Sequence, residues 1–463
     1  MHTVLSVALV AGYVVVLTFV AVRARAAREY AEFSLAGRAL PLALIFGSLC
    51  ATYVGPAFSI GFVGKGFLSG FLFLGIGLAY AIQNVVVGVL IAPRLRALND
   101  CHTLGDAIGQ RYNSHCHVLA GVVSVGLCTG FAAVMAKAGG VVLNDLFGLP
   151  PWSSVTIVVG ITTLYTTSGG LRASVITDAF QFTAFAILLP VVLLVTLAFH
   201  LEGGGATLLA QGVAATSEGL ASTSALKIVG LVTAFLLGEM LIPPYANRAL
   251  ASETTRVSRN GFILAGLFSV VWFLVMISLG LVARSLVPGG TNEDHVLLRL
   301  VKAVMPMGGY VLLLAVMVSI IMSSLDSLLN AGAVAFTQDI VRPLRRVPDA
   351  AALDIGRAAT IVIAAAAAVG AVAVPGIISG LLVCYTIWAP AILPALVLGL
   401  WLKRPRPLAG ILSMIVGALV AILSQFVFSD VMQTPAIIPA LAAALLAYAF
   451  GHWMGARRAG GAG

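Results

Sequence analysis

The sequence predicts an all-α polytopic membrane protein with about thirteen transmembrane helices. Of its 463 residues, 60% are hydrophobic and only 9% are charged, whereas soluble domains are roughly 45–50% apolar and about 25% charged. A transmembrane helix needs about 20 mostly apolar residues, so spans fill the chain and leave no room for a sizeable domain outside the membrane. The 49 glycines and 19 prolines are tolerated in membrane helices, above all where a helix is interrupted at a binding site. We therefore expect a channel or transporter.

Apolar runs bounded by charges, by Pro/Gly clusters or by polar loops define the candidate spans. We place them at residues 3–22, 42–64, 67–93, 116–146, 152–168, 173–199, 227–248, 259–286, 308–336, 358–376, 378–401, 408–428 and 435–455. The first run lacks the basic n-region and the small-residue cleavage site of a signal peptide, so we interpret it as a span.

The order of the spans predicts two five-helix repeats of opposite orientation, an architecture that places the binding site where one helix of each repeat is interrupted. We expect a peripheral N-terminal helix and cytoplasmic loop, a first repeat, a second inverted repeat, and two C-terminal helices with a short cytoplasmic tail: residues 1–41, 42–200, 227–401 and 402–463. Each repeat begins with a span that contains helix breakers. Gly55 and Pro56 interrupt the first of these spans, and Gly238, Pro243 and Pro244 interrupt the second. An ordinary proline kink in each span is the alternative.

The distribution of Lys and Arg predicts the orientation in the membrane. With the N-terminus outside and the C-terminus in the cytoplasm, most of the 26 basic residues, Arg248 among them, fall in inner segments. We expect a multi-pass protein of the plasma (inner) membrane. A basic cytoplasmic face next to anionic lipid also accounts for the net charge of +9, so we expect no nucleic-acid partner.

Four ionisable side chains fall at membrane depth, where charged groups are costly and usually functional. Asp178 follows a Gly-Gly turn and could ligate a cation, relay protons or pair with Arg172 at the interface. Glu239 lies in the second break and could hold a cationic substrate or pair with Lys137. Lys137 could equally receive a substrate carboxylate or extend to the outer surface. The fourth residue, Asp326, belongs to a serine-rich run.

That run combines Asp326 with Ser323, Ser324 and Ser327 at helical spacing, and Asn330 follows one turn later. Hydroxyls, a carboxylate and the carbonyls of an unwound helix supply the oxygen ligands that a hard cation such as sodium prefers. Serines in membrane helices are often packing or back-bonded residues. The aspartate within the serine cluster favours the cation site over that alternative.

Candidate substrate-binding residues surround the two breaks and one later span. Aromatic residues of span 378–401 are plausible walls of a cavity, although membrane aromatics also serve as packing or interface anchors. The full candidate set is Gly55, Pro56, Phe58, Lys137, Glu239, Tyr385 and Trp388.

Three stretches are similar to motifs of one transporter family. Residues 169–181 read GGLRASVITDAFQ and are similar to G-G-L-x-A-x-x-x-T-D-x-x-Q, and residues 323–330 read SSLDSLLN, followed by TQDI at 337–340. A weaker match is FSLAGR at residues 33–38. With these motifs, its length and its span pattern, the chain resembles the solute:sodium symporter (SSS) family over essentially its whole length. The resemblance implies the LeuT-type inverted-repeat fold.

The resemblance also implies a sodium site between the first and eighth core helices. By position, it would use backbone carbonyls and hydroxyls of Ala51, Val54, Ile320, Ser323 and Ser324. Family members with a second sodium use an aspartate that corresponds here to Asp178 and serines late in the eighth-helix motif, here Ser327, with Asp326 in place of a small residue more common in some members, so one or two ions remain open. Polar side chains that some sugar-transporting members place after the break are replaced by Pro56, Ala57 and Phe58, which argues against a sugar.

We therefore expect a symporter in which inward sodium flow drives import of a small organic solute by alternating access. Glu239 favours a cationic or zwitterionic solute and Lys137 a carboxylate, so a zwitterion, an amine or a small organic acid is expected. The alternatives are a proton-coupled carrier that uses Asp178 or Glu239, and a transporter-like sensor, since family members occur fused to histidine kinases. The sequence contains no nucleophile–base pair, metal-ligand spacing or phosphate loop, so we do not expect an enzyme. The oligomeric state stays open.

Overall fold

The computed structural model describes residue 12 and residues 29–98, 100–345, 347–427 and 435–460. Apart from residue 12, the predicted span at 3–22 lies outside the described residues. Throughout the described ranges the chain forms helices joined by turns, and its one β-type pairing is an isolated bridge between Leu40 and Ser252. This all-helical architecture agrees with the predicted fold class.

The helices of the first predicted repeat are α3 (Leu42–Tyr53), α4 (Phe62–Ser69), α5 (Phe71–Val86), α6 (Ala92–Arg96), α8 (Ser114–Phe147) and α9 (Pro151–Phe199). Those of the second are α11 (Ala225–Leu237), α12 (Pro243–Ala251), α13 (Thr255–Leu286), α15 (Met307–Ala335), α17 (Asp349–Gly370) and α18 (Ile377–Trp401). Two helices close the chain, α19 (Pro407–Ile422) and α20 (Ile437–Gly460). Shorter helices connect them: α2 (Tyr30–Leu35), α7 (Leu104–Arg111), α10 (Gly204–Ser222), α14 (Val296–Val304) and α16 (Arg342–Leu344).

Nine helices within the described ranges are long and apolar enough to cross a membrane, and eleven spans result if two bent pairs are each counted as one. The predicted number of thirteen is thus not reached by length and composition alone. The difference arises in part because interrupted spans consist of half-helices, each too short to qualify by itself.

Both predicted breaks are present. Helix α3 ends at Tyr53, the chain becomes helical again at Ala57, and the two parts are bent by 59°. In the second repeat α11 ends at Leu237 and α12 begins at Pro243. Proline suits the first turn of a helix because its missing N–H would have no partner there. The backbone between α11 and α12 adopts a left-handed conformation at Leu241, with φ of 50°.

Other boundaries differ from the prediction. The predicted spans 152–168 and 173–199 are two helices that meet without a loop at Gly170, where φ is 60° and the backbone is not helical, and both carry the label α9. A Cβ at this glycine would lie 2.7 Å from the Cα of Phe33, so the kink also allows a close backbone approach. The span predicted at 358–376 begins earlier, at Asp349, because Pro348 precedes a helix-favouring alanine-rich segment. Helices α7, α10 and α14 were not predicted.

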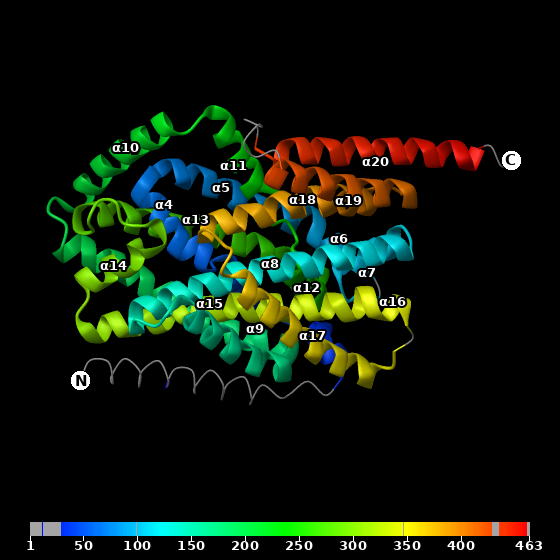
Figure 1. Ribbon diagram of the computed structural model, residues 1–463, viewed down its shortest axis with the longest axis horizontal. Coiled ribbons are helices and arrows are strands. Elements are labelled where there is room, and N and C mark those ends of the chain that lie inside the picture. Colours follow the sequence, from blue (N-terminus) through cyan, green and yellow to red (C-terminus); the bar gives the residue numbers. More distant parts are fainter. Residues whose placement is uncertain (1–11, 13–28, 99, 346, 428–434, 461–463) are drawn as a thin grey trace.

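The long helices α8, α15, α18, α19 and α20 run along the long axis of the molecule (Figure 1). Helix α15 packs against α8 and α9. In its most apolar stretch 94% of the residues are buried, so this helix forms the centre of the bundle. Helices α10 and α14 lie at one end, and α7 and α16 lie at the other (Figure 1). The breaks in α3–α4 and α11–α12 therefore face a central helix that carries the serine-rich run.

Candidate ion and solute site

The serine-rich run of α15 faces Asp178 on α9. Ser323 donates a hydrogen bond from Oγ to Asp178 Oδ1 at 2.5 Å. One turn further along α15, Asp326 Oδ1 accepts hydrogen bonds from Ser174 at 3.0 Å and from Ser327 at 3.2 Å. All five side chains are at most 4% exposed. The two carboxylates thus belong to one buried polar network.

Arg248 of α12 extends into this network and forms a fully buried ion pair. Its Nη2 lies 2.9 Å from Asp178 Oδ2 and donates to Ser327 Oγ at 2.6 Å. Its Nε donates to Ser48 Oγ at 2.8 Å, and Ser48 in turn donates to Asp178 Oδ2 at 2.6 Å. The placement of Arg248 on the inner face was therefore wrong, because a desolvated guanidinium needs a carboxylate partner. Asp178 pairs with this arginine and not with Arg172.

The residues of the expected sodium site lie where α3 is interrupted. Ala51 and Val54 are buried at the end of α3, and the Val54 carbonyl accepts a hydrogen bond from Ser59 Oγ at 2.6 Å. Ser324 approaches the break from α15, since a Cβ on Gly55 would lie 2.7 Å from Ser324 Oγ. This Oγ is buried and has no hydrogen-bond partner among the residues that the structure describes. Ile320, one turn earlier on α15, is 2% exposed.

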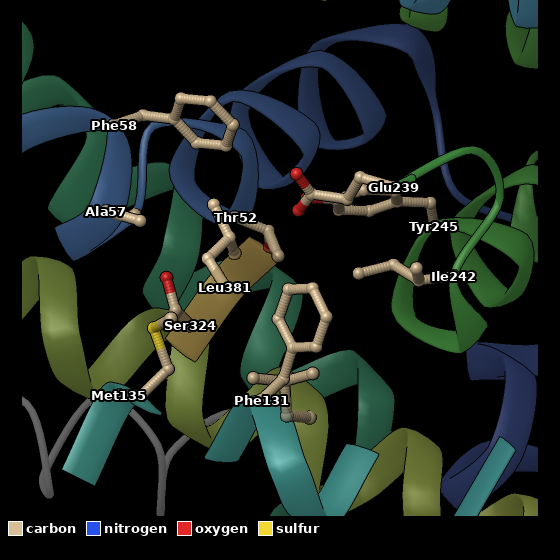
Figure 2. A pocket seen from close by; sticks show the side chains of 12 residues that line it. Thr52, Ala57, Phe58, Phe131, Met135, Glu239, Ile242, Tyr245, Ser324 and Leu381 are labelled. Atoms are coloured by element: carbon tan, nitrogen blue, oxygen red, sulfur yellow. The ribbon is translucent and has the colours of Figure 1, made fainter. Parts of the chain in front are cut away.

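A small cavity of about 20 Å³ adjoins this break. A volume of this size holds about one water molecule, so the central site is closed to a larger solute in this conformation. Figure 2 shows Glu239 and Tyr245 on one side of the cavity and Ser324 on another, with Phe58 and Phe131 at its ends. The lining residues are Thr52, Gly55, Ala57, Phe58, Phe131, Met135, Glu239, Ile242, Tyr245, Ser324, Leu328 and Leu381.

Glu239 projects into the cavity from the non-helical segment between α11 and α12, and it is 3% exposed. Both of its carboxylate oxygens accept hydrogen bonds from tyrosine hydroxyls, one from Tyr245 and one from Tyr385. The Tyr245 hydroxyl also lies 3.3 Å from that of Tyr80 on α5. Trp388 does not line the cavity, and its Nε1 donates to the Met240 carbonyl at 3.1 Å, which fixes the backbone of the break.

The predicted substrate residues therefore divide into two groups. Glu239, Gly55 and Phe58 line the cavity, and Tyr385 contacts it through Glu239. Lys137 of α8 is only partly buried, does not line the cavity, and forms no ion pair within the described part of the chain. The suggested pairing of Lys137 with Glu239 is thus wrong.

Comparison with known proteins identifies the family. Residues 33–417 match the sodium:solute symporter family. The chain belongs to this family. The resemblance inferred from the motifs is thus confirmed, and membership of a transporter family agrees with the expectation that the protein is not an enzyme.

Relatives with assigned names are distant. The chain is 26% identical to sodium/glucose cotransporter 2 of Rattus norvegicus over 70% of this chain and 56% of the relative. It is 24% identical to the sodium/glucose cotransporter of Vibrio parahaemolyticus over 85% and 79% of the two chains, and 23% identical to the human sodium/myo-inositol cotransporter over 68% and 50%. The chain thus spans only about half the length of the two mammalian relatives.

Solved structures share the fold. A Na⁺-coupled sialic acid symporter in a substrate-bound outward-open state superimposes with a TM-score of 0.84 at 17% identity, over 97% of this chain and 98% of the other. A nucleobase-cation-symport-1 family transporter in a closed conformation gives a TM-score of 0.60 at 13% identity, over 93% and 96% of the two chains. The protein therefore has the LeuT-type architecture expected for its family.

Several residues of this symporter-family chain contribute to the site but were missed from the sequence. Arg248 was assigned to the inner face because it stands at the end of an apolar run. A signal was available, since it follows the helix-breaking Pro243 and Pro244 by only one turn. Ser48, one turn before Thr52 on α3, offered a weaker signal. Nothing in the local sequence distinguished Tyr245 or Tyr80 from other membrane tyrosines.

Proposed function

We propose that the protein is a sodium-coupled symporter that imports a small organic solute across the plasma membrane, with its N-terminus outside and its C-terminus in the cytoplasm. The observation that carries this proposal is the unpartnered Oγ of Ser324 beside the interrupted backbone of α3. A buried hydroxyl without a partner is costly, and an ion that it coordinates removes that cost. Membership of the sodium:solute symporter family supports sodium as that ion.

The proposed sodium ligands are oxygen atoms of uncharged groups. The last carbonyls of a helix have no partner within that helix, so Ala51 and Val54 offer such groups at the end of α3. Ser323 donates its proton to Asp178, and its lone pairs remain free to face a cation. Ile320 would contribute its carbonyl and Ser324 its hydroxyl. Asp178 orients the Ser323 hydroxyl and, being paired with Arg248, is not itself a ligand.

The proposal includes one sodium ion per cycle. Asp178, Asp326 and Ser327 form the candidate second cation site, but the guanidinium of Arg248 is bonded to Asp178 and Ser327. A fixed positive charge at this place opposes a second cation by direct repulsion. We expect sodium-dependent stabilisation to follow a binding curve with a Hill coefficient of about 1.

Sodium and solute are coupled in this proposal through the broken helices. Sodium binds the end of α3, and the solute binds the adjacent cavity beside Glu239. An ion that binds more tightly to the solute-accepting conformation shifts the population towards it. Import then follows when the paired breaks let the bundle open to one side of the membrane at a time.

The test is thermal unfolding of the purified protein in detergent, in sodium chloride and in potassium chloride of equal ionic strength. Sodium at about 100 times its dissociation constant stabilises by roughly 2.7 kcal/mol. Ser324→Ala should abolish the sodium-specific shift. Ser154→Ala is the matched control because Ser154 also carries a buried hydroxyl without a partner but lies at the start of α9. Equal sodium shifts in the Ser324 variant and the wild type would refute the ion site.

Proton coupling is a second candidate, because Asp326 Oδ2 is buried without a partner in a network that contains Asp178. In this case protonation of Asp326 replaces sodium binding. A sodium-free pH series would show stabilisation towards low pH that Asp326→Asn removes. If unfolding in potassium does not depend on pH in this way, this candidate fails.

A further inference from the structure

Glu239 is a buried acidic residue without an opposite charge beside it. Within the described part of the chain no basic side chain forms an ion pair with its carboxylate, whose two oxygens accept hydrogen bonds from the hydroxyls of Tyr245 and Tyr385, with the Tyr80 hydroxyl beside them. Arg248, which belongs to the same segment after the break, is fully engaged by Asp178 and its neighbours. A carboxylate held away from water is stable only with a countercharge or as the neutral acid. The missing positive charge is a property that the solute can supply.

Aromatic rings surround this carboxylate from several helices. Tyr245 packs edge-on against Tyr53 with 4.3 Å between ring centroids, and Tyr80 lies 4.4 Å from Phe58. The ring centroid of Phe131 on α8 lies 5.8 Å from that of Tyr385, whose hydroxyl donates to Glu239. Aromatic faces attract organic cations through the ring quadrupole, and this attraction grows when water is excluded.

The rest of the cavity offers little to other classes of solute. Thr52 already donates its hydroxyl proton to the Ser48 carbonyl at 3.0 Å, and Tyr245 donates its own to Glu239, which leaves Ser324 as the lining side chain whose hydroxyl is unpaired within the described part of the chain. A sugar or cyclitol needs several hydrogen-bond partners for its hydroxyls, since unpaired polar groups weaken binding. No Lys, Arg or His lines the cavity, so a solute carboxylate would meet only Glu239 and be repelled.

We infer that the solute is a small organic cation whose ammonium group binds Glu239 among these aromatic rings, and that it carries no carboxylate. This inference rests on the proposed sodium-coupled transport and names the solute class of the same site. It separates this chain from its relatives named for glucose and myo-inositol. The ammonium group pairs with the carboxylate, the rings replace its hydration, and its apolar remainder contacts Met135, Ile242 and Leu381.

The test compares two probes of equal shape that differ in charge. In saturating sodium chloride, thermal unfolding is followed while (2-hydroxyethyl)trimethylammonium or its uncharged carbon isostere, 3,3-dimethylbutan-1-ol, is titrated. Tetramethylammonium and 2-aminoethanol extend the cationic series, and myo-inositol and lactate represent the other classes. We expect at least one cation to stabilise the protein and the uncharged isostere, the cyclitol and the acid to have no effect.

Glu239→Gln keeps the shape of the side chain and removes its charge, so it should weaken binding of the cation by about 10- to 100-fold, as expected for the loss of a charge-assisted contact. Glu202→Gln is the matched control, because Glu202 is exposed and remote from the cavity. Phe131→Leu should weaken cation binding by about 3- to 30-fold through loss of one ring. Glu239→Asp retains the charge and should retain part of the affinity.

The sodium shift measured without any solute separates the two proposals. If sodium stabilises the protein but no cation does, or if the isostere binds as well as the cation, the solute class is wrong and sodium coupling stands. Unchanged affinity in Glu239→Gln with its sodium shift intact would overturn the inference in the same way. If sodium itself has no effect on the wild type, the proposed function fails independently of the solute.

Discussion

Loss of Arg248 should destabilise the protein more than loss of any exposed charge, because this guanidinium is fully buried. It donates four hydrogen bonds, to Ser48 Oγ, the Pro244 carbonyl, Asp178 Oδ2 and Ser327 Oγ, at 2.6–2.9 Å. Removing one partner of a buried ion pair costs about 3–5 kcal/mol, since the other charge is left uncompensated. We expect Arg248→Met and Asp178→Asn each to lower the free energy of unfolding by about this amount.

A double-mutant cycle tests this reasoning directly. Arg248→Met with Asp178→Asn should cost about as much as either single change, because both remove the same pair, which gives a coupling energy of about 3 kcal/mol. The control pair is Arg284→Met with Glu218→Gln, whose ion pair has a Glu218 side chain that is 59% exposed and should couple by less than about 1 kcal/mol. The measurement is unfolding in detergent micelles titrated with sodium dodecyl sulfate. Additivity of the Arg248 and Asp178 changes within about 0.5 kcal/mol would refute the argument.

Three further predictions concern other parts of the molecule. His295 Nδ1 lies 2.8 Å from Asp145 Oδ2, and this hydrogen bond raises the pKa of the imidazole above 6.5. The stability that the bond contributes is complete below pH 6.5 and is lost as pH rises through the raised pKa. Asp145→Asn should therefore make the thermal unfolding temperature less dependent on pH. Gly170→Ala should destabilise the protein strongly, because φ is 60° and the added Cβ would meet Phe33. In the control Gly126→Ala the added Cβ has no atom within 4 Å, so stability should change by less than about 1 kcal/mol. Similar losses of stability in both variants would contradict the steric account. Asp339→Asn removes the charge that joins α7, α8 and the end of α15 and should cost about 1–3 kcal/mol, with faster hydrogen exchange in α7; unchanged exchange there would disprove that connection.

The broken helices were predictable because their cause is local. Gly55, Pro56 and Pro243 cannot sustain regular helical hydrogen bonding, and each marks its break in the sequence itself. The importance of Asp178 and Asp326 was also visible in the sequence, because ionisable groups at membrane depth are usually functional, but the contact between Asp178 and Ser323 was not predicted. The individual sodium ligands and solute contacts stay predictions, as does the division into domains at residues 42–200 and 227–401.

The rest depends on contacts that no local pattern reveals. Arg248 conforms to the positive-inside rule by position, and only the turn of α12 into the core makes it an internal countercharge. Tyr80 and Tyr245 are two of 10 tyrosines, and their role arises from the meeting of α5 with α12. Helices α10 and α14 lie at one end of the bundle (Figure 1), and the sequence that forms α10 was left outside both predicted repeats.

The isolated bridge between Leu40 and Ser252 has a mechanical consequence. Leu40 N–H donates to the Ala251 carbonyl at 3.1 Å, and Glu253 N–H donates to the Leu40 carbonyl at 3.0 Å. These two bonds connect Leu40, which precedes Pro41 and the start of α3, to the residues at the end of α12. The start of α3 is therefore held directly against the end of α12. A tilt of either half-helix must carry the other with it. The Arg248 guanidinium moves with this unit, so any tilt must either carry Asp178 of α9 and Ser327 of α15 along or break the bonds between them and the guanidinium.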